Sequence, residues 1–105
     1  MKIFIGGIKR KHTDKFTKRW PYQAFEFAEE EASVAEWMRL AANCAHHLVY
    51  QHRTSHKHIR YLARHSIVPK FTDSTPIMMQ MIEEILTTGS TTHSYTKEQQ
   101  CLPST

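Results

Sequence analysis

Hydrophobic positions at the start of the chain favour a short strand. The segment from Lys2 to Ile8 is rich in β-branched and aromatic residues, which is typical of strands. A single strand is not stable alone in water, so it must pair with another segment, such as residues 67–71, or with a second chain. Pro69 lacks a backbone N–H, and this would place residues 67–71 at an edge of the sheet.

A long stretch without Gly or Pro follows, from Tyr22 to Gln51. Its apolar residues recur at nearly helical spacing, and Pro21 suits the first turn of a helix. A single helix over 22–52 is one interpretation. The other is a break at Ser33, which could cap a second helix with Glu36 three residues further on. We favour a single helix with at most a slight kink.

Two shorter helices are predicted in the second half of the chain. Thr54 and Ser55 offer a cap for a helix over 56–66. Ser74, followed by Thr75 and Pro76, is typical of a helix start, and Gly89 is placed to end a helix over 75–88. Residues 90–105 are rich in Ser, Thr and Gln, which predicts a flexible polar tail.

These elements together predict a mainly α fold. We expect a small single domain of three to four helices over residues 1–89, with one short N-terminal strand element at 1–8 and a basic connector at 9–20. The core would be built from large apolar residues of the helices and from the Met-rich last helix. The expected core residues outside that helix are Phe25, Phe27, Trp37, Leu40, Leu48 and Leu62.

Composition favours a cytoplasmic protein. Cys44 and Cys101 are the two cysteines of 105 residues, too few for the disulfide framework of a small secreted domain. No stretch approaches the roughly 18 apolar residues of a membrane span. The first apolar run is broken by Gly6 and Gly7, unlike the core of a secretory signal. We therefore expect no membrane partner.

Charge is segregated along the chain, although the formal net charge is only +4. Residues 1–20 sum to +6 and residues 37–72 also sum to +6, whereas residues 21–36 contain five Glu and no basic residue. Residues 73–105 sum to −3. The five Glu could balance the basic blocks within the chain or across a dimer.

The two basic blocks are the candidate binding site. In a helix from Arg53 onward, Arg53, Lys57, Arg60 and Arg64 would share one face. Like charges so placed repel one another, and an anionic partner would remove that cost. Cationic surfaces of this kind bind nucleic-acid backbone by releasing counterions. The first block adds Lys9, Arg10, Lys11, Lys15, Lys18 and Arg19.

Histidines are also concentrated, with six of the eight between His46 and His65. His52 and His56 have the i, i+4 spacing that can present two imidazoles to one zinc ion. No carboxylate or cysteine lies nearby in the sequence to complete a tetrahedral site, and the surroundings are cationic. We therefore predict neither a metal site nor a cofactor.

Arg60 and His65 form a short pattern, an Arg followed after four residues by a His. It resembles the signature of the HEPN family of helical ribonucleases, although Tyr61 replaces the usual polar residue after the Arg. The resemblance covers six residues. It implies that Arg60 would stabilise the scissile phosphate and that His65 would assist in acid–base catalysis across a dimer.

Three hypotheses for function remain. The leading one is a small, non-catalytic basic module that contacts RNA or DNA backbone, or another anionic surface. The alternative is a regulator or inhibitor that docks on an acidic surface of a larger protein or host enzyme complex, as mobile elements encode. The third is a HEPN-like ribonuclease.

Overall fold

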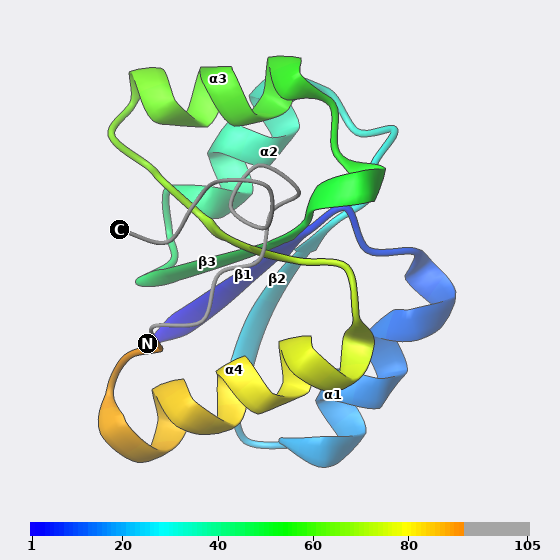
Figure 1. Cartoon of the computed structure of the whole chain (residues 1–105), viewed down its shortest axis with the longest axis vertical. Coiled ribbons are helices and arrows are strands. Elements are labelled where there is room, and N and C mark those ends of the chain that lie inside the picture. Colours follow the sequence, from blue (N-terminus) through cyan, green and yellow to red (C-terminus); the bar gives the residue numbers. More distant parts are fainter. Residues whose placement is uncertain (92–105) are drawn as a thin grey trace, which may run out of the picture.

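The computed structural model describes residues 1–91 and shows an α/β fold (Figure 1). Four helices accompany a four-stranded parallel sheet in this part of the chain, so the prediction of a mainly α fold with one strand element is wrong. The elements in chain order are β1 (Lys2–Gly6), the 3-10 helix η1 (Arg10–His12), α1 (Thr13–Arg19), β2 (Ala24–Ala28), α2 (Val34–Ala41), β3 (His46–Tyr50), the 3-10 helix η2 (Gln51–Arg53), α3 (His56–Arg64), β4 (Lys70–Thr72) and α4 (Thr75–Thr88).

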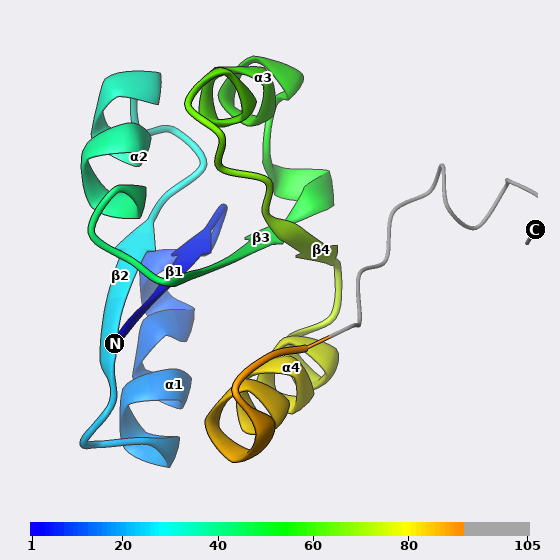
Figure 2. The same cartoon turned by 90° about the vertical axis from the view of Figure 1, so that its left-hand side faces the viewer.

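The strands lie in the order β2-β1-β3-β4, and every neighbouring pair is parallel. Helices α2 and α3 cover one face of the sheet, and α1 and α4 cover the other (Figure 2). The chain moves from β1 to β2 on one side and then returns to β3 on the other. The strand order therefore reverses between β1 and β3.

The expected helix over 22–52 is instead a strand, a helix and a second strand. Ser33 caps α2, and its hydroxyl accepts a hydrogen bond from the backbone N–H of Glu36 at 3.1 Å. The break at Ser33 therefore exists, but the residues before it form β2 rather than a helix. The buried run Leu48, Val49 and Tyr50 lies in β3, where a parallel strand covered on both faces favours continuous apolar sequence.

β1 is a central strand with neighbours on both sides. It pairs with β2 and β3, and not with residues 67–71 as we expected. That segment supplies β4, which pairs with β3 and lies at the edge of the sheet. Pro69 immediately precedes β4, in agreement with the edge position.

The sheet separates two hydrophobic cores. Side chains alternate along β1, so Ile3 and Ile5 face α1 and α4, while Phe4 faces α2 and α3. The first core contains Ile8, Phe16, Leu48, Tyr50, Met78, Met81, Ile82 and Ile85. The second contains Ala28, Trp37, Ala41, Val49 and Leu62. The expected core residues Phe25, Phe27 and Leu40 are half-buried and pack against the two cores.

Local signals define the last helix. The Ser74 hydroxyl accepts a hydrogen bond from the N–H of Ile77, and Gly89 ends α4 in the left-handed conformation with φ of 91°. The expected polar tail falls on residues 90–105, of which 92–105 lie outside the described residues. Among residues 1–91, no helix is both long enough and apolar enough to cross a bilayer.

Candidate anion-binding site

The carboxyl ends of the parallel strands meet at one edge of the sheet. Ligands of open α/β sheets bind in the crevice at this edge, where the strand order reverses. Here the reversal lies between β1 and β3. The loop that follows β1 (residues 7–12) and the loop that follows β3 (residues 51–55) therefore border the candidate site.

Gly7 lets these two loops approach each other closely. Its φ is +78°, and a Cβ atom at this position would lie 2.5 Å from Oγ1 of Thr54 and 3.1 Å from the carbonyl oxygen of Tyr50. Thr54 is held in place because its hydroxyl donates a hydrogen bond to the same carbonyl at 2.9 Å. The residue after β1 is thus in van der Waals contact with the turn after β3.

Four cations come from these loops and from the first turns of α1. Lys9, Lys11 and Lys15 are exposed, and Arg53 is half-buried with its guanidinium carbon 6.0 Å from the centre of the Tyr50 ring. None of the four forms an ion pair within residues 1–91. No ion pair offsets their mutual repulsion there, and a bound anion would lower it.

The pKa of His12 reflects the positive potential of the site. Burial of its ring, together with the positive charges of Lys15, Lys11, Arg53 and Lys9, lowers its pKa below the ordinary value of 6.5. The three lysines come from η1, α1 and the residue before η1, whereas Arg53 comes from η2. The charges of both loops therefore converge on one place.

Asp73 fixes the turn that presents Arg53. Its carboxylate follows β4 and accepts hydrogen bonds from the backbone N–H of His52 at 3.0 Å and from Nε2 of Gln51 at 2.9 Å. Nε2 of His52 also lies 2.6 Å from the carboxylate. Three contacts to one side chain hold η2 against the end of β4.

The predicted ridge of four cations is divided in the structure. Helix α3 begins at His56, so Arg53 precedes it and belongs to the strand-end site. Lys57, Arg60 and Arg64 lie on α3, where all three are exposed and form no ion pair within the described residues. They extend the positive surface from the edge of the sheet along the outside of α3.

The structure separates the members of the first basic block. Arg10 lies 3.7 Å from Glu29, and Arg19 forms a 3.0 Å ion pair with Glu83. Both arginines therefore have a partner in the chain. Lys18 is exposed on the last turn of α1, at the opposite end of that helix from the site.

The structure also shows where the other sequence motifs lie. Arg60 and His65 are both exposed, and the His65 ring packs on Tyr61 with 5.0 Å between ring centres. Within residues 1–91, no three side chains of His, Cys, Asp or Glu are grouped as metal ligands would be.

Sequence reasoning missed Gly7, His12, Thr54 and Asp73. Gly7 meets Thr54, and His12 lies near Arg53, because β1 and β3 are adjacent in the folded sheet. Asp73 contacts η2 because β3 and β4 are adjacent. The residues Gly6-Gly7 directly after an apolar strand were the available signal. Comparisons with protein-family models, curated proteins and solved structures find no match for this chain.

Proposed function

We propose that this protein is a non-catalytic module that binds nucleic-acid backbone at the carboxyl edge of its sheet. The observation that supports this most directly is the group of four cations that have no ion-pair partner among residues 1–91, at the point where the strand order reverses. Phosphate is the anion that such a group fits, because charge neutralisation and counterion release provide the affinity.

The length of the positive surface favours a polymer over a single nucleotide. Lys57 and Arg64 are seven residues apart on α3, which corresponds to about 10 Å along a helix axis. Phosphates in one strand of duplex DNA are spaced by about 3.4 Å along the axis. A strand that begins at the sheet edge and continues along α3 would place several phosphates beside Lys57, Arg60 and Arg64.

The site favours affinity over base specificity. The cations are flexible lysines and one arginine, and contacts to phosphate carry no sequence information directly. We place this activity in the cytoplasm, because the chain has two cysteines and Cys44 forms no disulfide within residues 1–91. Docking on an acidic protein surface is the competing proposal, and it is an outcome of the following experiment.

The test is fluorescence anisotropy with single-stranded RNA and DNA of about 16 nucleotides. We expect binding by nuclease-treated protein, with affinity that falls steeply between about 50 and 200 mM salt. The double variant Lys11→Gln/Arg53→Gln should bind at least about 10-fold more weakly, and its salt slope should be shallower by about 1.4.

A matched variant removes the same charge elsewhere. Lys70 is exposed at the first residue of β4, at the opposite end of that strand from the site. Lys70→Glu alters the net charge by the same two units and should change affinity by less than about twofold, since only long-range screened attraction is lost. Equal losses in Lys70→Glu and in the double variant would overturn the proposed site. Absence of binding at low salt, combined with nuclease-resistant capture of an acidic protein, would favour the docking proposal.

A further inference from the structure

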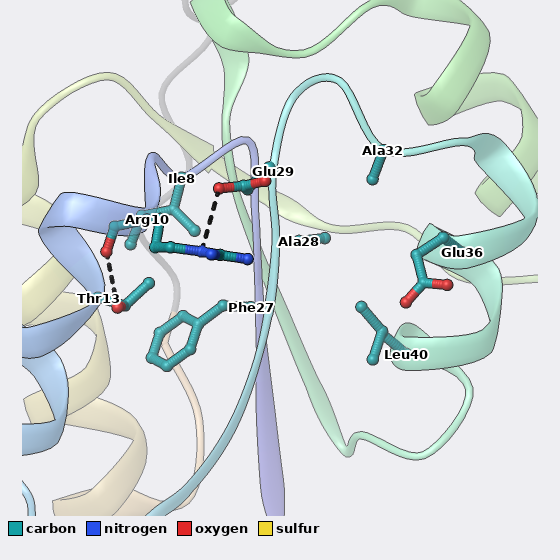
Figure 3. Close-up of a pocket in the computed structure, with 9 residues that line it drawn as sticks. All are labelled: Ile8, Arg10, Thr13, Phe27, Ala28, Glu29, Ala32, Glu36 and Leu40. Carbon is teal, nitrogen blue, oxygen red and sulfur yellow. Dashed lines mark hydrogen bonds and ion pairs between the residues drawn. The ribbon is translucent and has the colours of Figure 1, made fainter.

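Within the part of the chain that the structure describes, the strand β2 has an open edge. It pairs with β1 on one side and is the outermost strand of the sheet on the other. Figure 3 looks onto this edge, with the start of α1 on one side of the strand and α2 on the other. An unpaired edge exposes backbone donors and acceptors that another strand can satisfy.

A groove lies over the carboxyl half of this edge. It encloses about 370 Å³, with Phe27 and Leu40 among its apolar lining. Arg10, Glu29 and Glu36 supply polar groups at its margins (Figure 3). The groove is large enough for an aromatic side chain and offers partners for a hydroxyl.

A fully exposed aromatic side chain lies at the other end of the same strand. Tyr22 precedes β2 by two residues and is 101% exposed. The adjoining surface is also apolar, with Trp20, Pro21 and Leu86 around a second hollow of about 360 Å³. One end of β2 therefore presents an exposed aromatic side chain, and the other end presents a groove that could receive one.

We propose that a second copy of this chain occupies this edge, by antiparallel pairing of the two β2 strands. A two-fold axis through Glu26, the middle residue of β2, places Tyr22 opposite the partner's Glu30, beside the partner's groove. The same axis places Ala24 opposite the partner's Ala28. Both copies insert their tyrosine at once, so the contact is self-complementary and closed.

Charge supports the antiparallel direction. Lys18 is exposed near the amino end of β2, and Glu30 and Glu31 are exposed just after its carboxyl end. Antiparallel pairing brings the lysine of each copy towards the partner's two glutamates. The two Glu26 side chains meet near the axis, but each lies 3.6 Å from Lys2 of its own chain, which reduces their repulsion.

This inference goes beyond the proposed function and does not depend on it. The cations of the anion-binding site follow β1 and β3, whereas the dimer contact uses β2 and the segments at its two ends. Failure of either proposal therefore leaves the other standing.

Sedimentation equilibrium of the full chain tests the dimer. We expect a species at twice the 12.3 kDa chain mass. Tyr22→Ser should raise the dissociation constant at least about 10-fold, because buried tyrosines contribute strongly to interfaces. Val68→Ser is the matched control, since Val68 is 76% exposed next to the opposite edge strand β4. A monomer at all accessible concentrations, or equal effects of the two variants, would overturn the proposal.

A charge exchange tests the direction of pairing. Lys18→Glu and Glu30→Lys should each weaken the dimer, and the double variant should recover most of the loss, because the attraction is restored with opposite sign. Hydrogen exchange of the β2 amides should also slow as the protein concentration rises. This geometry would be excluded if the loss of dimer affinity in the double variant equalled the sum of the losses in the two single variants. It would also be excluded if the exchange rates of the β2 amides did not depend on protein concentration.

Discussion

At the scale of single residues, His58 joins α3 to the loop before α2. The ring is 7% exposed and lies 4.8 Å from the Trp37 ring. A carbonyl can only accept a hydrogen bond, so Nε2 donates to the carbonyl oxygen of Ala32 at 2.6 Å, while Nδ1 is hydrogen-bonded to the Ser55 hydroxyl at 2.7 Å. This ring is therefore structural, in contrast to the exposed histidines around it.

The change His58→Ala should lower the free energy of unfolding by about 2–4 kcal/mol, because it opens a cavity and leaves a buried carbonyl without its donor. Urea denaturation measures the loss. His56→Ala is the control. His56 lies two residues before His58 and is exposed, so this change should alter the free energy of unfolding by less than about 0.5 kcal/mol. Similar losses in both variants would contradict the role given to His58.

Cys44 shows how burial controls reactivity. Burial, with a further contribution from the negative charge of Glu26, raises the pKa of its thiol to about 11. At about pH 8 the thiolate fraction is then roughly 100-fold smaller than for an ordinary cysteine, and alkylation should slow in proportion. Peptide mass spectrometry after iodoacetamide treatment, with urea-unfolded protein as reference, measures this rate. A folded rate equal to the unfolded rate would contradict it.

At the scale of elements, the contact between the β1 and β3 loops depends on Gly7. Gly7→Ala adds left-handed strain and a clash with Thr54, so we expect a loss of about 2–4 kcal/mol in stability and weaker nucleic-acid binding. Gly89→Ala separates the two causes. Gly89 also has a positive φ, but a Cβ there meets nothing within 4 Å. Gly89→Ala should therefore lower the free energy of unfolding by about 1 kcal/mol and leave binding unchanged. Altered binding in Gly89→Ala alone would contradict the coupling.

Elements with local boundary signals were predictable from the sequence. Ser74 and Pro76 mark the start of α4, and Gly89 marks its end. Each of these signals lies within two residues of the boundary that it marks. The cap at Ser33 was recognisable because it is a local signal of the same kind. The failure concerns β2 and β3. No Gly or Pro separates them from α2, and the Ala and Glu residues of β2 also suit a helix. These segments form strands because they pair with β1. That pairing joins residues far apart in the chain, so the local sequence does not predict it.

The candidate site was predictable in composition but not in shape. The basic blocks identified Lys9, Lys11, Lys15 and Arg53 as surface cations, because dense like charge seldom lies in a core, although Arg53 is half-buried. Their convergence depends on a strand order that the sequence pattern did not reveal. The helical ridge placed Arg53 with the cations of α3, whereas the chain leaves β3 through η2 before that helix begins.

At the scale of the whole molecule, the fold converts charge blocks in the sequence into charged surfaces. Lys9, Lys11 and Lys15 of the first basic block meet Arg53 at the carboxyl edge of the sheet, and the acidic residues 29–31 follow the edge strand β2. An anionic polymer would therefore approach the β1–β3 crevice rather than the β2 end. Because these cations also lower the pKa of His12, binding of an anion should be coupled to proton uptake by His12.

This linkage predicts that the proposed nucleic-acid binding strengthens as pH falls. The pKa of His12 in the free protein is lowered by burial and by four cations. Bound phosphates neutralise those cations, so the pKa rises in the complex and binding takes up a proton within that interval. Affinity at constant ionic strength should increase from about pH 7.5 to about pH 6. The relevant quantity is the difference in pH dependence between the wild type and His12→Gln, measured by anisotropy. Identical pH dependence in the two proteins would show that His12 lies outside the field of the bound phosphates.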